Sequence, residues 1–166
     1  MTSSRPAPAL RRLFRLPVAI YRCGCGWLLG HRFLLLIHTG RRSKLRRYTV
    51  LEIIEYRSQG PEAIVMSGFG ATANWLRNIE AMPNPEVVIG SRRFVASHRR
   101  LGDDEAVGVL LRYQRRNRLM TVIIQLVLGR LLGWRFDGSQ VHCRRAVQQL
   151  PLIGFSPMTS YSSISF

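Results

Sequence analysis

The residues best suited to binding chemistry lie in a short basic turn. An apolar run, 33–37, ends at His38-Thr39-Gly40, and five cations follow within seven positions: Arg41, Arg42, Lys44, Arg46 and Arg47. Ser43 adds a hydroxyl group. Backbone N–H groups and forked guanidinium groups both direct donors at oxygen atoms, so this turn could hold a multiply charged anion. The alternative interpretation is a charged loop that only faces water.

Two β-rich runs flank the turn and must position it. They cover about 32–38 and 47–56, so strand, basic turn and strand is the simplest interpretation. The pattern further along the chain predicts a third strand at 62–67, a hairpin of 86–89 and 92–100 around Gly90-Ser91, and a last strand at 150–155.

Helical signals lie between and after these strands. Thr72 is predicted to cap a helix over about 73–81, on which Trp75, Asn78 and Ile79 share one face. Three acids at 103–105 open a second helical region, with an apolar stripe that includes Leu111, and this region extends to about 132, alone or as a pair broken near 116–117. Ser139 is predicted to cap a last helix, ending at 149. We therefore expect an α+β protein, a small antiparallel barrel with helical additions.

The composition limits the kind of partner. The 166 residues carry 25 Lys+Arg against 9 Asp+Glu, a formal net charge of +16, which favours nucleic acid, anionic lipid or a polyanionic small molecule. A hydrophobic content of 46% excludes a disordered chain, and the length favours one domain with a real core. The cations are scattered and do not alternate with aromatic residues, so we expect no nucleic-acid partner.

Cysteine, histidine and hydropathy patterns point away from metals and membrane spans. The three cysteines are an odd number without zinc-like spacing, so we expect no metal site and a reduced, cytoplasmic location. The most apolar stretch, 119–134, is interrupted by Gln125 and Arg130 and is too short for a span. No signal peptide is recognisable.

The two ends of the chain differ from its middle. Residues 1–20 are predicted to form a polar, Pro-rich tail and a short basic amphipathic helix, which could rest on an anionic membrane or pack on the barrel. Residues 21–156 form the predicted domain, and residues 157–166 a disordered polar tail.

Several motifs in order resemble one known family. They are Thr39-Gly40-Arg41-Arg42-Ser43 with Arg47, then Ser67-Gly68-Phe69-Gly70, then Asn74-Trp75-Leu76-Arg77-Asn78, then Asn84-Pro85. Across about residues 25–155 the chain is similar to the deazaflavin-dependent nitroreductases of actinobacteria. The resemblance implies a split β-barrel of about six antiparallel strands with flanking helices, like FMN-binding proteins. It also implies the coenzyme F420, an 8-hydroxy-5-deazaflavin with a phosphate and an oligoglutamate tail.

The resemblance also implies a set of site residues. The phosphate would be bound by Arg41, Arg42, Ser43 and Arg47, and the coenzyme would be lined by Thr49, Val50 and Leu51. The ring and tail would lie beside Met66, Ser67 and Gly68, and the pocket would be closed from a helix by Asn74, Trp75 and Asn78. Tyr113 lies roughly where the family has a tyrosine near the substrate.

Some positions depart from the family pattern. Lys44 stands where glycine is common, so the geometry of the basic turn could differ. Asn74 stands where aspartate or proline is frequent, and Leu76 where tyrosine is frequent. In some branches of the family a lysine occupies the position of Gly68. These departures concern contacts to the tail of the coenzyme and the choice of substrate more than the fold.

The implied activity is hydride transfer from reduced F420 to a small electrophile such as a nitro compound, a quinone or an activated alkene. The first alternative is an FMN-dependent oxidoreductase on the same barrel. The second is a non-enzymatic basic module that binds anionic membrane or nucleic acid. A monomer or a homodimer, cytoplasmic and in peripheral contact with membrane, fits the resemblance and the charge.

Overall fold

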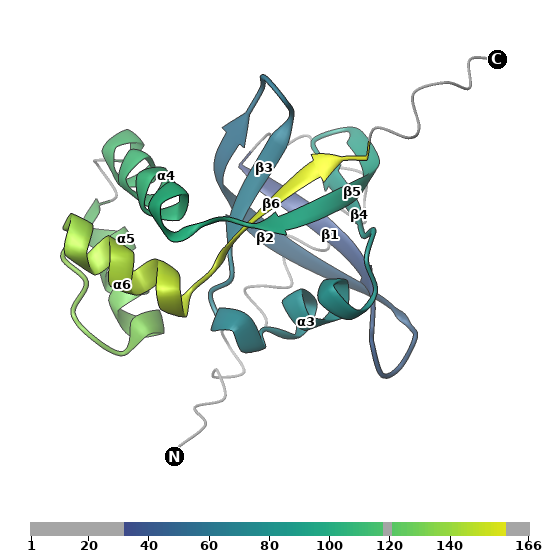
Figure 1. The fold of residues 1–166 in the computed structure, drawn as a ribbon, viewed down its shortest axis with the longest axis horizontal. Coiled ribbons are helices and arrows are strands. Elements are labelled where there is room, and N and C mark those ends of the chain that lie inside the picture. The colour runs from purple at the N-terminus through teal and green to yellow at the C-terminus, as the bar shows by residue number, and fades with distance from the viewer. Residues whose placement is uncertain (1–31, 118–120, 159–166) are drawn as a thin grey trace.

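Six antiparallel strands close into a barrel in the computed structural model, which describes residues 32–117 and 121–158 (Figure 1). Their order around the barrel is β1-β2-β3-β6-β5-β4. The strands are β1 (Phe33–Thr39), β2 (Arg46–Arg57), β3 (Glu62–Met66), β4 (Glu86–Ile89), β5 (Arg92–Arg100) and β6 (Leu152–Pro157). The predicted class, a six-stranded antiparallel split barrel with flanking helices, is confirmed.

The barrel is built from two sheets that share two strands. One sheet pairs β2 with β1, β1 with β4, and β4 with β5. The other sheet pairs β2 with β3, β3 with β6, and β6 with β5. The long strands β2 and β5 therefore pass from one sheet to the other, and β2 does so with an irregularity between Ile53 and Glu55. Such a bulge bends a strand and increases its twist.

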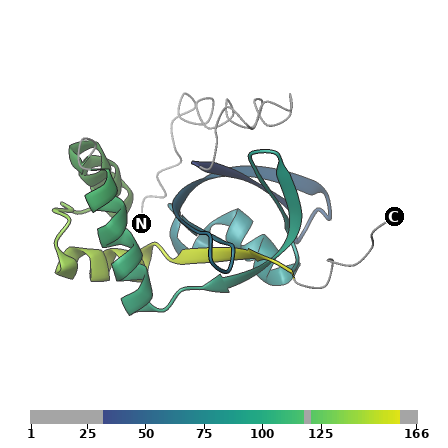
Figure 2. The same ribbon diagram turned by 90° about the horizontal axis from the view of Figure 1, so that it is seen from above.

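Four α-helices and one 3-10 turn are found among the described residues. They are η2 (Gly70–Thr72), α3 (Asn74–Ala81), α4 (Asp103–Arg116), α5 (Thr121–Leu132) and α6 (Gln140–Gln149). α4, α5 and α6 lie together on one side of the barrel, whereas α3 lies across one end of it (Figure 2).

Two main apolar cores follow from this arrangement. Inside the barrel, Leu34 and Leu36 of β1 pack with Phe155 of β6, and α3 adds Trp75 and Ile79. Because side chains of a strand alternate between its two sides, the next inward position on β1 after Leu36 is His38. The β1 strand thus carries its apolar side chains into the barrel and a histidine to the end that α3 covers.

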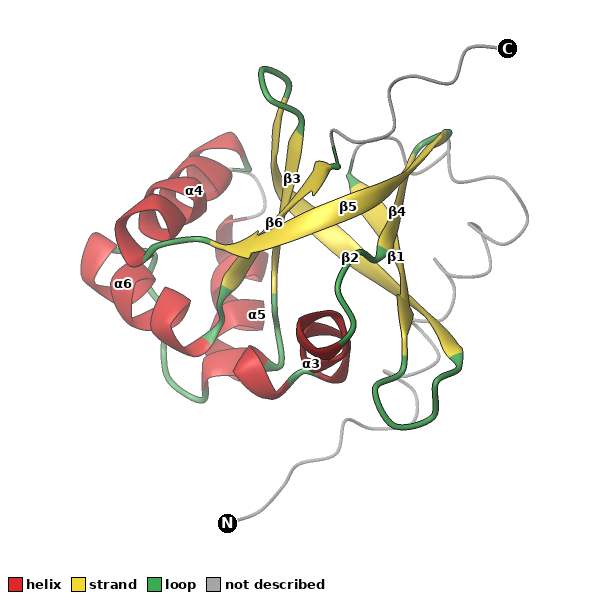
Figure 3. Ribbon diagram, turned by 45° about the vertical axis from the view of Figure 1, so that its right-hand side comes forward, coloured by secondary structure: helices red, strands yellow, loops and turns green. Residues whose placement is uncertain are grey.

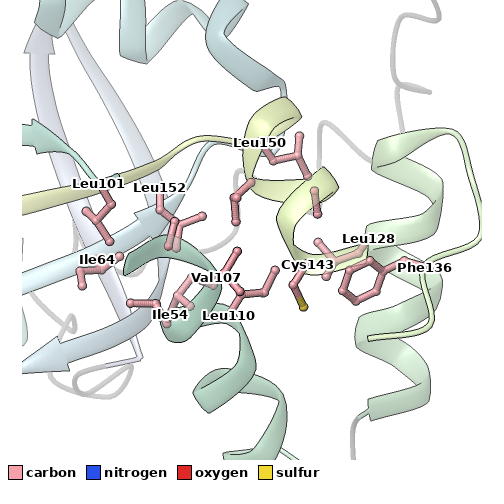
Figure 4. Packing of buried hydrophobic residues seen from close by; sticks show 14 of the residues in the cluster. Ile54, Ile64, Leu101, Val107, Leu110, Leu128, Phe136, Cys143, Leu150 and Leu152 are labelled. Atoms are coloured by element: carbon pink, nitrogen blue, oxygen red, sulfur yellow. The ribbon is translucent and has the colours of Figure 1, made fainter. Parts of the chain in front are cut away.

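The second core joins the barrel to the helical side. The cluster extends from Ile64 of the barrel past Leu110 of α4 and Cys143 of α6 to Leu128 of α5 and Phe136 (Figure 4). The apolar stripe predicted for the first helix is buried except at Leu111, which is half-buried.

The local predictions succeed where short-range chemistry determines the structure. The hairpin around Gly90-Ser91, the paired helices after Asp103 and the Ser139 cap are confirmed. The Ser139 side chain accepts a hydrogen bond from the backbone N–H of His142. Met158 donates its N–H to the Val95 carbonyl, so the strand pairing reaches beyond residue 156, the predicted end of the domain.

Two local predictions are wrong. Thr72 does not cap α3, because residues 70–72 form a 3-10 turn and the Thr72 hydroxyl donates to the Phe69 carbonyl instead. The last strand begins at Leu152 rather than at Leu150, because the Leu150 N–H still bonds to the Ala146 carbonyl at the end of α6. The basic helix predicted within residues 1–20 lies outside the described residues, as do residues 159–166 of the predicted tail 157–166, whose first residue, Pro157, ends β6.

No helix in the described ranges has the length and apolar character that crossing a bilayer requires.

Candidate functional site

The basic turn between β1 and β2 is closed by its own backbone. The Gly40 N–H donates to the Leu45 carbonyl at 2.9 Å, and the Lys44 N–H donates to the Gly40 carbonyl at 2.8 Å. A Cβ atom on Gly40 would stand 2.6 Å from the Ser43 hydroxyl oxygen, so glycine permits this close approach. Lys44 has a φ of 56°, the left-handed conformation that glycine favours. The turn therefore has the geometry expected for a glycine at 44, although a lysine occupies the position.

Helix α3 holds the start of this turn through two asparagines. The Asn78 side-chain oxygen accepts hydrogen bonds from the Arg41 backbone N–H at 3.2 Å and from Arg41 Nη1 at 3.0 Å. The Asn74 side-chain oxygen accepts a longer bond, at 3.4 Å, from the same guanidinium group. The turn leaves the barrel at the end where α3 lies (Figure 3). Residues more than thirty positions apart, all predicted as site residues, are thereby brought together.

His38 joins this group from inside the barrel. Its Nδ1 lies 3.2 Å from Asn78 Nδ2, and its Nε2 lies 3.2 Å from the Thr49 hydroxyl. An amide nitrogen only donates, so His38 Nδ1 accepts and the imidazole proton is on Nε2. Burial, aided by the positive charge of Arg47, lowers the pKa of His38 to about 4, so the ring is neutral near pH 7.

Two donors of Arg41 determine which way the Asn78 amide faces, and His38 accepts from the amide nitrogen on the other side. With the amide nitrogen bonded to His38, the amide oxygen is left to receive Arg41. His38 was not among the site residues predicted from the sequence. Its position two residues before Gly40, on the inward side of β1, was the available signal.

Carboxylates neutralise many arginines of the barrel and helices but not those at the tip of the turn. The paired arginines are Arg57 and Arg99 with Glu62, Arg112 with Glu55, Arg46 and Arg93 with Glu86, and Arg144 with Asp104. Within the described part of the chain, Arg42 has neither a hydrogen-bond nor an ion-pair partner. Arg47 makes a 3.4 Å bond to the Ser43 hydroxyl and is otherwise exposed. The donors of Arg42 and Arg47 therefore remain available to an anion.

The predicted lining residues of β2 face two sides of the strand. Leu51 packs toward the barrel core, and Thr49 lies on the same side, against His38. Val50 lies on the outer side with Leu35 and Ile37. One cofactor surface can therefore be formed by Val50 or by the pair Thr49 and Leu51, but not by the three side chains together.

Met66, Ser67 and Gly68 lie at the end of β3, toward the helical side. Ser67 is fully buried, and its hydroxyl donates to the Gly70 carbonyl at 2.7 Å. A Cβ atom on Gly68 would be 3.6 Å from Leu131 of α5. Met66 packs against the core that joins the barrel to α4–α6. Within the described ranges, no hydrogen bond or ion pair joins these residues to the basic turn.

Trp75 and Tyr113 stand apart from the turn as well. Trp75 is buried in the barrel core, and its ring centroid lies 6.4 Å from that of Phe155. The Tyr113 hydroxyl on α4 donates to a Glu52 carboxylate oxygen at 2.9 Å. Burial, and then the charge of Glu52, raise the pKa of Tyr113, so its phenol stays protonated. Glu52 was not among the predicted site residues.

In the part of the chain that the structure describes, no group of three or more His, Cys, Asp and Glu side chains is placed to hold a metal ion. Two open surface hollows lie on α6 and α5. They are lined by residues 140–148 and 122–136, so neither includes a predicted coenzyme residue.

The family of the chain follows from its sequence. The model of the F420H(2)-dependent quinone reductase family matches residues 13–122, which include the basic turn, α3 and Tyr113. The chain belongs to this family. The resemblance to deazaflavin-dependent reductases is thereby confirmed, and the family description names a quinone, one of the three acceptors that the resemblance implied. No curated protein matches the chain significantly.

Solved structures similar to this F420H(2)-dependent quinone reductase family member are distant in sequence. An F420-H2 dependent reductase, FDR-A, is 16% identical, covers 77% of this chain and 96% of its own, and has a TM-score of 0.44. The heme storage protein HutZ from Vibrio cholerae is 11% identical over 81% of this chain and 87% of its own, with a TM-score of 0.49. A pyridoxamine 5'-phosphate oxidase-related, FMN binding protein from Nostoc punctiforme is 12% identical over 93% and 82%, with a TM-score of 0.49. At these values no functional argument rests on the three structures.

The residues of the turn fit the phosphate of the coenzyme that this family uses. Arg42 and Arg47 carry exposed guanidinium groups, and Ser43 carries a hydroxyl within 3.4 Å of Arg47 Nη2; groups of these types donate hydrogen bonds to phosphate oxygens. Arg41 is turned toward α3 by Asn78 and so supports the turn from behind. Val50 packs with Phe33 and Val88 around the buried Leu35 and Ile37 on the outer side of the barrel.

Proposed function

We propose that this protein is an F420H2-dependent oxidoreductase, which transfers a hydride from the reduced deazaflavin to a small electrophilic acceptor. The observation that carries the proposal is the basic turn, held in shape by α3 and His38 inside the segment that matches the family. The family description favours a quinone as acceptor. A nitro compound and an activated alkene are electrophiles of the same class.

In this proposal the chain binds and orients, and the bound coenzyme supplies the hydride. Arg42, Arg47 and Ser43 hold the phosphate by charge-assisted hydrogen bonds. Asn78 and Asn74 keep Arg41 against α3, so that the turn does not collapse onto the anion site. Pre-set donors of this kind lose little conformational entropy when the ligand binds, which strengthens binding.

Tyr113 is the residue that we assign to the acceptor. Its protonated hydroxyl is a hydrogen-bond donor held by Glu52, which follows Val50 on the outer side of β2. A quinone or nitro oxygen that gains electron density on reduction is a better hydrogen-bond acceptor than the starting oxygen. Because a phenol has one proton to donate, the Tyr113 hydroxyl would exchange Glu52 for this oxygen and would thereby favour the reduced acceptor.

Binding titrations separate this function from the alternatives. The full chain is titrated with F420, with FMN and with a single-stranded oligonucleotide, each at low and high NaCl. We expect F420 to bind more tightly than FMN and to retain that preference in high salt. Binding of all three ligands that falls steeply with salt would instead indicate a general polyanion binder. Tighter binding of FMN would favour the flavin enzyme.

A turnover assay then tests whether the chain catalyses oxidation of reduced F420. Reduced F420 is mixed with the full chain and a water-soluble quinone, and oxidation of the coenzyme is followed by its absorbance. Catalysed oxidation that requires the quinone supports the proposal. F420 binding without catalysed oxidation by quinone, nitro or alkene acceptors would contradict it.

A further inference from the structure

Helix α5 exposes apolar side chains on its outer side. Leu128 and Leu132 point into the core, with 6% and 9% of their surface exposed. The opposite side chains are much more exposed, at 69% for Val122, 69% for Leu126 and 52% for Val127. Ile123 and Leu131 extend the same apolar surface. A helix that is apolar all round is normally buried on all sides or lies in a membrane.

Arginines border this surface. Arg130 and Arg135 line one hollow together with Val122 and Leu126. Arg145 reaches the same region from α6, with its guanidinium carbon 4.5 Å from the centre of the Trp134 ring. We call Val122, Ile123, Leu126, Val127 and Leu131, with Arg130, Arg135 and Arg145, the α5 surface.

We propose that the α5 surface docks onto an anionic lipid bilayer. The apolar side chains would enter the boundary between headgroups and acyl chains, and the bordering arginines would pair with lipid phosphates while their stems stay apolar. Helices that bind in the plane of a membrane combine these two features. The helix does not cross the bilayer, since no described helix is long and apolar enough to do so.

The positive charge of the α5 surface and of the whole chain favours an anionic bilayer over a second copy of this chain as the partner of that surface. In a two-fold symmetric interface the same patch meets itself, so Arg130 and Arg135 would face their own counterparts. Each copy also carries a formal net charge of +16, which opposes association. An anionic bilayer satisfies both the apolar side chains and the cations.

This inference goes beyond the proposed function, because most of α5 follows the segment that matches the family, which ends at residue 122. Membrane attachment was expected from the sequence, from the pairing of the cationic N-terminal segment with the apolar stretch 119–134. The inference assigns the contact to α5, which lies within that stretch, and to its bordering arginines.

Sedimentation with vesicles tests the inference on the full chain. Vesicles of phosphatidylcholine alone are compared with vesicles of equal parts phosphatidylcholine and phosphatidylglycerol. We expect binding to the anionic vesicles only. The double variant Val122→Glu with Leu126→Glu should lower the partition coefficient roughly tenfold or more, because two exposed apolar anchors become charged. The fold should survive, since both side chains are exposed.

Two further double variants separate the effect of the apolar side chains on membrane binding from the effect of charge. Ser91→Glu with Val95→Glu adds the same charge near the β4–β5 turn, where Ser91 and Val95 are exposed, and should partition like the wild type apart from a small charge effect. Arg130→Gln with Arg135→Gln should weaken binding to anionic vesicles and reduce its salt dependence.

Three results would overturn the inference. The first is a wild-type chain that stays in the supernatant with anionic vesicles at low salt. The second is equal binding by the α5 double variant and its charge-matched control. The third is a concentration-dependent dimer, seen by sedimentation velocity, that the α5 double variant abolishes, because a second copy would then be the occupant.

Discussion

His38 Nδ1 lies 3.2 Å from Asn78 Nδ2, forty residues further along the chain. The pairing requires an unprotonated His38 Nδ1, because two donors cannot share a hydrogen bond. It leaves the Asn78 oxygen for the Arg41 N–H and guanidinium. A buried histidine is thus linked through Asn78 to the exposed basic turn, which it does not enter.

Replacing His38 by leucine should weaken F420 binding although His38 does not contact the anion. The change leaves the Asn78 amide free to turn and the Thr49 hydroxyl without its partner. We expect affinity to fall several-fold, and stability to fall by about 1–3 kcal/mol for the unpaired buried groups. Isothermal titration and urea unfolding measure the two effects. Unchanged affinity in a folded His38→Leu variant would remove His38 from the support of the site.

The same histidine predicts a pH dependence of stability. The pKa of His38 is about 4 in the folded chain against an ordinary value of 6.5, so the unfolded chain binds the proton first as the pH falls. Its contribution to stability is therefore complete above pH 6.5 and is lost between pH 6.5 and about 4. Urea unfolding at pH 7 and pH 5 should show a smaller loss for His38→Gln than for the wild type. Equal losses would contradict the buried neutral ring.

Arg42→Ala and Arg47→Ala should each weaken F420 binding by roughly 1.5–3 kcal/mol, the range for hydrogen bonds to charged groups. Neither side chain pairs with a carboxylate in the described structure, so stability should hardly change. Arg92→Ala, at an exposed position of the β4–β5 hairpin, is the matched control and should bind as the wild type does. If both turn variants keep wild-type affinity, the basic turn is not the phosphate site.

Lys44→Gly should stabilise the protein by about 0.5–1 kcal/mol, because it removes a side chain from the left-handed conformation at the cost of some chain entropy. Asn84 has a similar φ of 65° and is the control. Asparagine tolerates this conformation better than lysine, so Asn84→Gly should gain less. Thermal unfolding compares the two variants. A loss of stability in Lys44→Gly alone would mean that the lysine side chain supports the turn.

Trp75→Phe separates a core role from a coenzyme role. The indole is buried against Phe155, so the smaller ring should cost about 1–2 kcal/mol of stability, less than removal of the whole side chain. If Trp75 acts only in the core, F420 affinity stays at the wild-type level. The opposite pattern, an unchanged melting temperature with several-fold weaker binding, would show that the indole forms a wall of the pocket.

Short-range patterns in the sequence determined most of the helices and strands. They also determined the cluster of basic residues that we propose as the phosphate site. Alternation along β1, the Gly90-Ser91 turn and the Ser139 cap depend on neighbours two to four residues away, so they can be predicted without knowledge of the fold. The cluster of cations at 41–47 is local in the same way.

Only the tertiary structure decided how these parts meet. The closing of the barrel places α3 under the turn, and this placement pairs Asn78 with both His38 and Arg41. It also directs Trp75 into the core, and it places Val50 and Thr49 on opposite sides of one strand. Contacts between residues far apart in sequence depend on strand register and helix packing, which the whole chain determines.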